Sequence, residues 1–203
     1  MKRLHEILLI NFCVAIAFVF GCATAPEVKT YLLDTAVAPP SAAQVEGAKI
    51  LLVNTPTAQP GYDTADIAYS RAPLAVEYYT QSQWADTPAR MLAPLVVQAL
   101  ETTGAFKAVV TPPTPALDDV RLDLDIIRLQ QDFLSQPSQA QLLVRARLFD
   151  VNRGQVLATQ LFETSAPAPS EDAYGGVQAA NAAVEQFLAQ LSGFVVEYAY
   201  AED

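Results

Sequence analysis

Residues 120–130, with the sequence VRLDLDIIRLQ, carry the clearest strand pattern in this chain. Apolar Val120, Leu122, Leu124 and Ile126 alternate with Arg121, Asp123, Asp125 and Ile127, which is the pattern of a strand that buries one face and exposes the other. Residues 141–151 (QLLVRARLFDV) alternate in the same way, with Arg145 and Arg147 on the polar side. The sequence therefore predicts two long neighbouring strands.

Folding these two strands into a hairpin about Ser135 sets Asp125 opposite Arg145 and Asp123 opposite Arg147. Opposite charges that face each other across strands stabilise a sheet by roughly 0.2–1 kcal/mol per pair. The alternative for the two aspartates is a paired-carboxylate or metal site. We favour the cross-strand ion pairs.

Further strands are expected on both sides of the hairpin, with loops rich in Pro, Ala and Gly between them. Residues 49–54 are nearly all apolar, which favours a strand buried on both faces. Asn152-Arg153-Gly154 is typical of a tight turn that leads from the second strand of the hairpin into a third strand. The expected strands outside the hairpin cover residues 30–35, 49–54, 67–71, 75–80, 106–111 and 155–164, with a loop over 56–64 and a linker over 166–170.

The chain also contains two helical patterns. The first begins with Thr87 as the N-cap and Pro88 at the first helical position, and it ends at Gly104. Pro94 lies inside this pattern and predicts a kink or a loose first turn. The second pattern covers residues 173–198 and carries an apolar stripe, which indicates core packing rather than a lipid groove.

This order of strands and helices predicts a single α+β domain: an antiparallel or mixed β-sheet with two main helices packed on one face.

The N-terminus has the features of a secretory signal. Met1-Lys2-Arg3 is basic, residues 7–20 are apolar apart from Asn11, and Gly21 precedes Cys22. A cysteine in this place resembles a bacterial lipobox, in which the thiol is acylated and the chain is cut before it. The sequence predicts a cleaved signal peptide over 1–21, a lipidated leader over 22–29 and a domain over 30–203. An ordinary secreted protein and a short transmembrane anchor are the alternatives, although spanning a bilayer takes about 20 apolar residues.

Composition excludes several functional classes. The chain has a net charge of −10, which argues against binding nucleic acid, because that binding depends on clustered Lys and Arg. His5 and Cys13 leave with the signal and Cys22 would carry lipid. The mature protein then has no disulfide, no usual zinc site and no Ser-His or Cys-His pair. We expect no cofactor other than the covalent diacylglyceryl and N-acyl lipid on Cys22.

Two groups of residues remain as candidate sites. Glu77 and Asp86 flank an aromatic region, which would suit a two-carboxylate glycosidase, but such carboxylates are common in an acidic chain. The aromatic residues either belong to the core or form an interface with a partner, because Tyr and Trp bury area and keep a polar tip. The candidate interface residues are Tyr69, Tyr78, Tyr79 and Trp84.

Several segments together resemble the ABC-type transport auxiliary lipoprotein family, the PqiC-like lipoproteins. Tyr31-Leu32-Leu33-Asp34 resembles the start of the family domain, and residues 50–56 resemble its first buried strand. The central resemblance lies in three segments: residues 67–71 (IAYSR), residues 76–79 (VEYY), and residues 84–88 (WADTP) before a helix that ends at Gly104-Ala105-Phe106.

The resemblance implies a non-enzymatic accessory protein of ABC transporters with MCE-type substrate-binding subunits, which move lipids between membranes. It implies an outer-membrane lipoprotein on the periplasmic side that docks the MCE-type protein and its ABC permease and ATPase, and it allows a homo-oligomer. Ala23 after Cys22 agrees with sorting to the outer membrane. A lipid-binding carrier with its ligand under the C-terminal helix is the alternative, and a glycan or lipid hydrolase is the weaker one.

Overall fold

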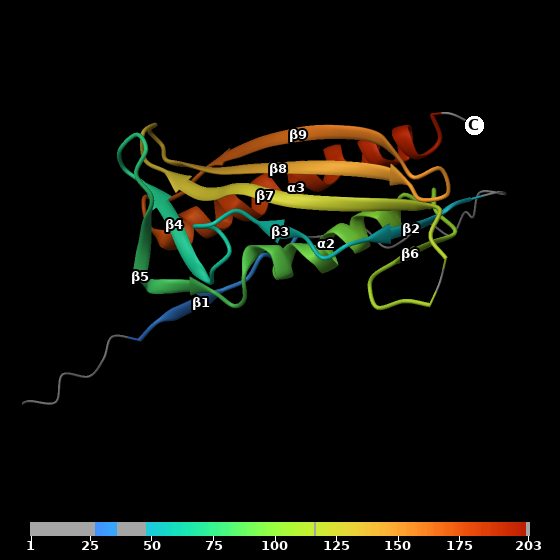
Figure 1. The fold of residues 1–203 in the computed structure, drawn as a ribbon. Coiled ribbons are helices and arrows are strands. Elements are labelled where there is room, and N and C mark those ends of the chain that lie inside the picture. The colour runs from blue at the N-terminus through green and yellow to red at the C-terminus, as the bar shows by residue number, and fades with distance from the viewer. Residues whose placement is uncertain (1–26, 36–47, 116, 202–203) are drawn as a thin grey trace, which may run out of the picture.

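A computed structural model describes residues 27–35, 48–115 and 117–201. They form a single α+β domain in which one mixed sheet of nine strands carries two helices, as the sequence predicts (Figure 1). The elements in chain order are β1 (Lys29–Tyr31), β2 (Ile50–Val53), β3 (Thr57–Ala58), β4 (Asp66–Ser70), β5 (Glu77–Trp84), α2 (Pro88–Thr102), β6 (Ala108–Val110), β7 (Val120–Asp132), β8 (Gln139–Asp150), β9 (Gln155–Pro167) and α3 (Ala173–Ala199).

The long strand β7 organises the sheet. One of its edges pairs along its whole length with β8 in an antiparallel hairpin, and β9 continues the meander beyond β8. The other edge pairs in succession with three short parallel strands, β2, β3 and β4. β6 extends the sheet from β2, while β5 and then β1 extend it from β4.

The predicted hairpin register is confirmed. Asp125 lies opposite Arg145 and Asp123 lies opposite Arg147. Asp125 Oδ2 is 3.6 Å from Arg145 Nη1, so the first pair forms the expected ion pair. Asp123 instead accepts a hydrogen bond of 2.6 Å from the side-chain amide of Asn54, which follows β2. Among the described residues, no group of three or more His, Cys, Asp or Glu side chains is placed to hold a metal ion.

Helix α2 begins at Pro88 with Thr87 in the N-cap position, as expected. The Thr87 hydroxyl makes no capping hydrogen bond, and the Asp86 carboxylate accepts from the Thr87 backbone N–H instead. The helix runs continuously through Pro94. Pro94 is exposed, so the carbonyl that loses its hydrogen-bond donor can be hydrated. Gly104 follows the helix with φ of 64°, as its predicted role as a stop requires.

Helix α3 supplies the centre of the core. Its apolar stripe is buried against the inward faces of β7, β8 and β9, in the same cluster as the buried side of α2. Phe162 on β9 lies edge-to-face against Phe187 and Phe194 of α3, with ring centroids 5.6 and 5.5 Å apart. These contacts confirm that the stripe is core.

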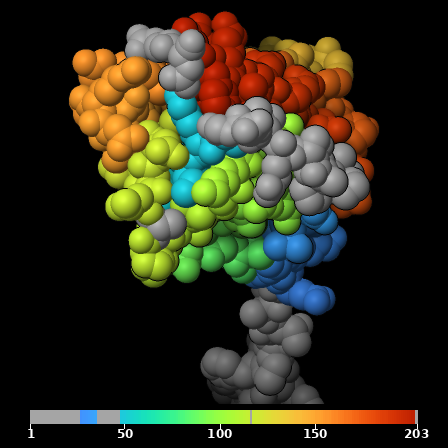
Figure 2. Space-filling view, turned by 90° about the vertical axis from the view of Figure 1, so that its right-hand side faces the viewer, coloured from blue at the N-terminus to red at the C-terminus, as the bar shows by residue number. Residues whose placement is uncertain are grey.

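The C-terminal end of α3 is fixed to the start of β2. Lys49 Nζ donates to the Ala199 carbonyl at 2.7 Å, and the Tyr200 hydroxyl donates to the Ala105 carbonyl at 2.7 Å. The Tyr200 ring also stacks on Phe106 at 6.0 Å. Figure 2 views this end of the molecule, where the last turns of α3 (red) lie beside β2 (cyan).

Several predicted boundaries differ from the structure. The first strand stops at Tyr31 because Asn181 of α3 bonds the next backbone groups, accepting from Asp34 N and donating to Leu32 O. The predicted loop over 56–64 contains β3, whose two residues are too few to show a pattern. The predicted linker over 166–170 begins inside β9, which runs on to Pro167 at the edge of the sheet, where proline is tolerated.

Candidate partner-binding surface

The predicted lipidation residue, Cys22, lies outside the described residues, as do residues 1–21. Its acylation therefore remains a prediction from the sequence. None of the helices in the described ranges has the length and hydropathy to cross a bilayer.

The four aromatic candidates occupy different environments. Trp84 is 3% exposed and belongs to the core. Tyr69 and Tyr79 lie together on the helix-bearing side of the sheet, with ring centroids 4.5 Å apart. The Tyr69 hydroxyl donates to Glu77 at 2.8 Å. Tyr78 points to the opposite side, where its hydroxyl donates to the Gly61 carbonyl at 3.1 Å. The structure thus brings Tyr69 and Tyr79 together and separates them from Tyr78 and Trp84.

Tyr79 belongs to a hydrogen-bond network that holds the start of α3. Its hydroxyl donates to Gln131 Oε1 at 2.8 Å, and Gln131 Nε2 donates to Ser138 Oγ at 2.9 Å. The Ser138 backbone N–H in turn donates to Glu171, just before the helix. Burial raises the pKa of Tyr79 to about 12, and the positive charge of Arg71 opposes the shift. The neutral hydroxyl is therefore the form that the fold favours.

Glu77 and Asp86 have different partners in the structure. Glu77, at the start of β5, accepts a hydrogen bond from the Tyr69 hydroxyl at 2.8 Å. Asp86, after the end of the strand, accepts from the Thr87 backbone N–H and forms an ion pair of 3.4 Å with Arg90. These separate contacts do not favour the carboxylate pair that the hydrolase hypothesis requires.

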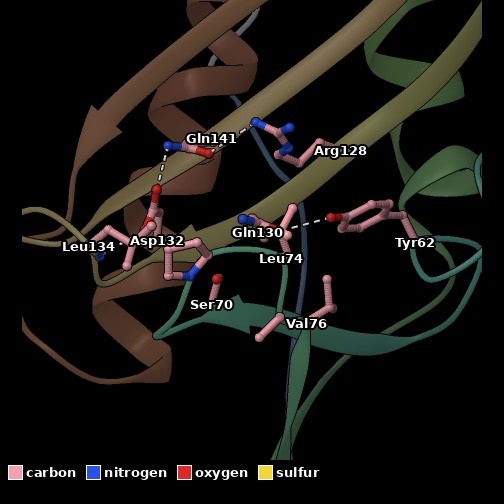
Figure 3. Close-up of a pocket in the computed structure, with 11 residues that line it drawn as sticks. Tyr62, Ser70, Leu74, Val76, Arg128, Gln130, Asp132, Leu134 and Gln141 are labelled. Carbon is pink, nitrogen blue, oxygen red and sulfur yellow. Dashed lines mark hydrogen bonds between the residues drawn. The ribbon is translucent and has the colours of Figure 1, made fainter.

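A pocket of about 380 Å³ opens on the sheet face that the helices leave uncovered (Figure 3). Its floor comes from β7 and β8, and its walls come from the turn between β4 and β5 and from the segment before β4. The lining residues are Tyr62, Ser70, Pro73, Leu74, Ala75, Val76, Arg128, Gln130, Asp132, Leu134 and Gln141.

The polar floor of the pocket is internally hydrogen-bonded, as the dashed lines in Figure 3 show. Gln141 donates to Asp132 Oδ2 at 2.7 Å and accepts from Arg128 Nη1 at 3.3 Å. The Tyr62 hydroxyl donates to Gln130 Oε1 at 2.7 Å. Burial raises the pKa of Tyr62, and the positive charge of Arg128 opposes the shift. These bonds fix the orientation of the floor side chains.

Sequence analysis did not find this pocket because a bulge shifts the register of β7. The ladder with β8 is regular up to Ile126 and resumes at Arg128, so Ile127 is the extra residue. A bulge of this kind reverses which side chains face each side afterwards. Arg128, Gln130 and Asp132 consequently share the open face with Asp125. The signal in the sequence is the apolar doublet Ile126-Ile127, which breaks the alternation.

The described residues define a class of protein: a single α+β module whose exposed features are a polar sheet face and a small pocket. Comparison with known families identifies which one. Residues 31–192 match the family of the ABC-type transport auxiliary lipoprotein component. The chain belongs to this family. No curated protein matches the chain.

Solved structures share the fold. The crystal structure of protein XCC0632 from Xanthomonas campestris matches with a TM-score of 0.75 at 24% sequence identity, covering 86% of this chain and 98% of that one. An uncharacterized protein matches at 0.66 and 13% identity, covering 83% and 99%. The hypothetical protein CT253 from Chlamydia trachomatis matches at 0.54 and 10%, covering 76% and 99%. At these identities the likeness concerns the fold alone.

Proposed function

We propose that this protein is a lipid-anchored periplasmic accessory component of an ABC transport system that moves lipids between membranes. In this proposal Cys22 carries the lipid and the partner is an MCE-type substrate-binding protein with its permease and ATPase. The family match over residues 31–192 carries the proposal, because it assigns the folded domain to an auxiliary role in ABC transport. The signal that ends at Gly21-Cys22 supplies the anchor.

The length of the leader supports a position close to the membrane. Six residues separate Cys22 from Lys29 at the start of β1, and an extended chain over these seven Cα-to-Cα steps spans at most about 25 Å. The β1 edge of the sheet would then face the membrane. Ala23 in place of an aspartate favours the outer membrane.

The packing of α3 favours an accessory protein over the lipid-binding carrier. A ligand under this helix would have to displace side chains that already fill the core, including Phe187 and Leu191, which are fully buried. Phe162 further occupies the space between β9 and the helix. The exposed features lie elsewhere, on surfaces suited to contact with a protein. We therefore place the partner interface on the open sheet face, at the exposed Tyr78 and the nearby pocket.

The proposal includes no catalysis. The mature chain lacks His and a free Cys, and the two carboxylates considered, Glu77 and Asp86, are held by different partners, Tyr69 and Arg90. The work of the protein is then to hold a partner at the membrane.

The anchor is tested by replacing Cys22 in a C-terminally tagged protein, with Cys13→Ala as the matched control because Cys13 lies within the signal. We expect Cys22→Ala to abolish incorporation of an alkyne fatty acid and to release the protein from membranes, and Cys13→Ala to change neither. Pull-down of the wild type from cross-linked, detergent-solubilised cells should enrich MCE-type and ABC subunits. Labelling that survives Cys22→Ala would overturn the anchor, and a pull-down without transporter subunits would overturn the partner. Light scattering of the purified protein measures its molar mass, and therefore whether it forms the homo-oligomer that the family resemblance allows.

A further inference from the structure

We propose that the pocket between the β7–β8 hairpin and the β4–β5 turn binds an acidic side chain, Asp or Glu, of an extended peptide segment in a partner protein. Identifying that partner as a transporter subunit rests on the proposed function. The chemistry of the pocket stands on the contacts described below.

The floor of the pocket has hydrogen-bond donors to spare and few acceptors. Both carboxylate oxygens of Asp132 already accept, one from Gln141 Nε2 at 2.7 Å and one from the Leu134 backbone N–H at 2.8 Å. The side-chain oxygens of Gln130 and Gln141 also accept one bond each. Each of these oxygens therefore already accepts one hydrogen bond within the floor, which leaves fewer lone pairs for a ligand that offers donors.

The donors are different. A guanidinium carries five N–H groups. Arg128 donates to Gln141 at 3.3 Å and also hydrogen-bonds the Tyr62 hydroxyl, and its remaining N–H groups are left for a ligand. Within the described part of the chain, the side-chain amide N–H groups of Gln130 make no hydrogen bond. Arg128 and Gln130 thus form a donor set suited to a carboxylate, in which the charged partner strengthens the bonds.

The formal charges of the pocket lining balance. Arg128 is the one cation and Asp132 the one carboxylate among the described residues that line it. Asp132 accepts from Gln141 and from the Leu134 backbone N–H within the floor, whereas Arg128 keeps N–H groups for a ligand. Arg128 therefore supplies the positive charge that an acidic side chain would meet.

The rim of the pocket is apolar and exposed. Leu74 is fully exposed at 108%, and Leu134 and Val76 are 55% and 44% exposed. Leu74 has φ of 64°, a left-handed conformation that is costly for a residue with a β-carbon. It follows Pro73 in a turn closed by the Ala75 N–H to Ala72 carbonyl bond, where glycine is the usual residue. A strained and fully exposed leucine adds nothing to the core, so we assign it to contact with a partner.

This combination fits a peptide better than a lipid. The apolar side chains that line the pocket lie at the rim, in the β4–β5 and β7–β8 connections, while the floor beneath them is polar. A hydrocarbon chain would have to lie across Arg128 and Gln130. A peptide instead presents a carboxylate to the floor and an adjacent aliphatic side chain to Leu74 and Leu134. A pocket of about 380 Å³ lies at the small end of ligand sites and suits one such side chain.

The test uses the folded periplasmic domain, residues 23–203, and a capped synthetic peptide, acetyl-Ala-Leu-Glu-Leu-Ala-amide, titrated in ¹⁵N NMR. We expect saturable shifts of the side-chain amides of Gln130 and Gln141. Replacing Glu by Gln in the peptide, or Arg128 by Gln in the protein, should weaken binding about tenfold or more, as expected for loss of a charge-assisted hydrogen bond. Arg145→Gln is the matched control, because Arg145 lies on the same sheet face outside the pocket.

Other outcomes overturn the proposal. The first is no saturable shift at millimolar peptide, and the second is equal binding of the Glu and Gln peptides. The third is an Arg145→Gln loss as large as that of Arg128→Gln. Shifts produced by phosphatidylglycerol vesicles and not by peptide would assign the pocket to a lipid headgroup. Tighter binding of a Gln peptide with a free C-terminus would assign it to a terminal carboxylate. Because no transporter subunit is present, failure here is distinguishable from failure of the pull-down.

Discussion

Gly176, in the first turn of α3, lies so close to the side chain of Gln131 on β7 that no β-carbon fits between them. Gln131 is itself buried and cannot move freely, because it accepts from Tyr79 and donates to Ser138. The helix therefore begins directly on a hydrogen-bonded amide of the sheet. This contact joins the core to the β4–β5 end of the molecule, where the candidate partner surfaces lie.

Gly176→Ala should destabilise the fold. The added methyl would push Gln131 off its partners, and we expect a loss of about 1–3 kcal/mol in the free energy of unfolding, as for overpacked cores. Gly193→Ala is the matched control in the same helix, because a β-carbon there meets nothing within 4 Å. That variant should gain about 0.5–1 kcal/mol from helix propensity. Urea denaturation measures both, and equal effects would contradict the contact.

Tyr79→Phe should cost about 1–2 kcal/mol at neutral pH, because it leaves Gln131 Oε1 buried without its donor. Tyr69→Phe, which removes an exposed hydrogen bond to Glu77, should cost less. Urea denaturation of the two variants therefore compares the contribution of the buried Tyr79 hydrogen bond to stability with that of the exposed Tyr69 hydrogen bond.

The same tyrosine predicts an alkaline loss of stability. The pKa of Tyr79 is raised to about 12 in the fold, against about 10 in an unfolded chain. The folded state therefore holds its proton more tightly, and that stabilisation is present below pH 10 and lost as the pH rises towards 12. Unfolding measured from pH 9 to 12 should show a steeper decline in the wild type than in Tyr79→Phe. Parallel curves would show that Tyr79 is not the titrating group.

Asp172 caps α3 by accepting from the Gly175 N–H at 2.8 Å, and this bond lowers the pKa of its carboxyl. Asp172→Ala should cost about 1 kcal/mol at neutral pH, and Asp172→Asn should cost less because the amide oxygen still caps. The charge stabilises the fold above the unfolded pKa, near 4, and is lost as the pH falls through the lower folded value. The difference between wild type and Asp172→Asn should therefore vanish in acid. A constant difference down to pH 2 would contradict this.

Two substitutions of Leu74 distinguish its effect on stability from its effect on partner binding. Leu74→Gly removes both the side chain and the strain of its positive φ, and it should raise the free energy of unfolding by roughly 1 kcal/mol. Leu74→Ala removes the side chain but keeps the strain, so its stability should stay close to the wild type. Both variants should reduce capture of the partner in pull-downs to a similar extent. Full capture by both would show that Leu74 does not contact the partner.

The fold was largely predictable because its long elements carry strong patterns. The alternation in β7 and β8 indicates that they pair, and the opposite charges of Asp125 and Arg145 were enough to predict the register that the buried apolar faces specify. The misplaced elements depend on distant contacts: β3 exists because β7 offers it an edge, and β1 ends where Asn181 takes over its backbone bonds.

The candidate surfaces were less predictable for the same reason. Counting aromatics found Tyr69 and Tyr79, which do lie together, but it grouped them with Trp84, which the core buries. The pocket depends on the bulge at Ile127, which turns Arg128 to the open face. A shift of one residue in the register decides which face Arg128 occupies, and the local strand propensity of the sequence does not determine that shift.

Our proposal places a subunit of an ABC transport system on the open sheet face around Leu74. Site-specific photocrosslinking tests this contact, with benzoylphenylalanine in place of Leu74 and, as a control, in place of Leu117, which is also exposed, at 89%, and lies outside the pocket. After irradiation of living cells, mass spectrometry identifies the adducts. We predict that the probe at position 74 crosslinks to an MCE-type or ABC transporter subunit and that the probe at 117 does not. No transporter adduct from position 74, or the same adducts in equal yield from both positions, would show that this face does not bind the transporter.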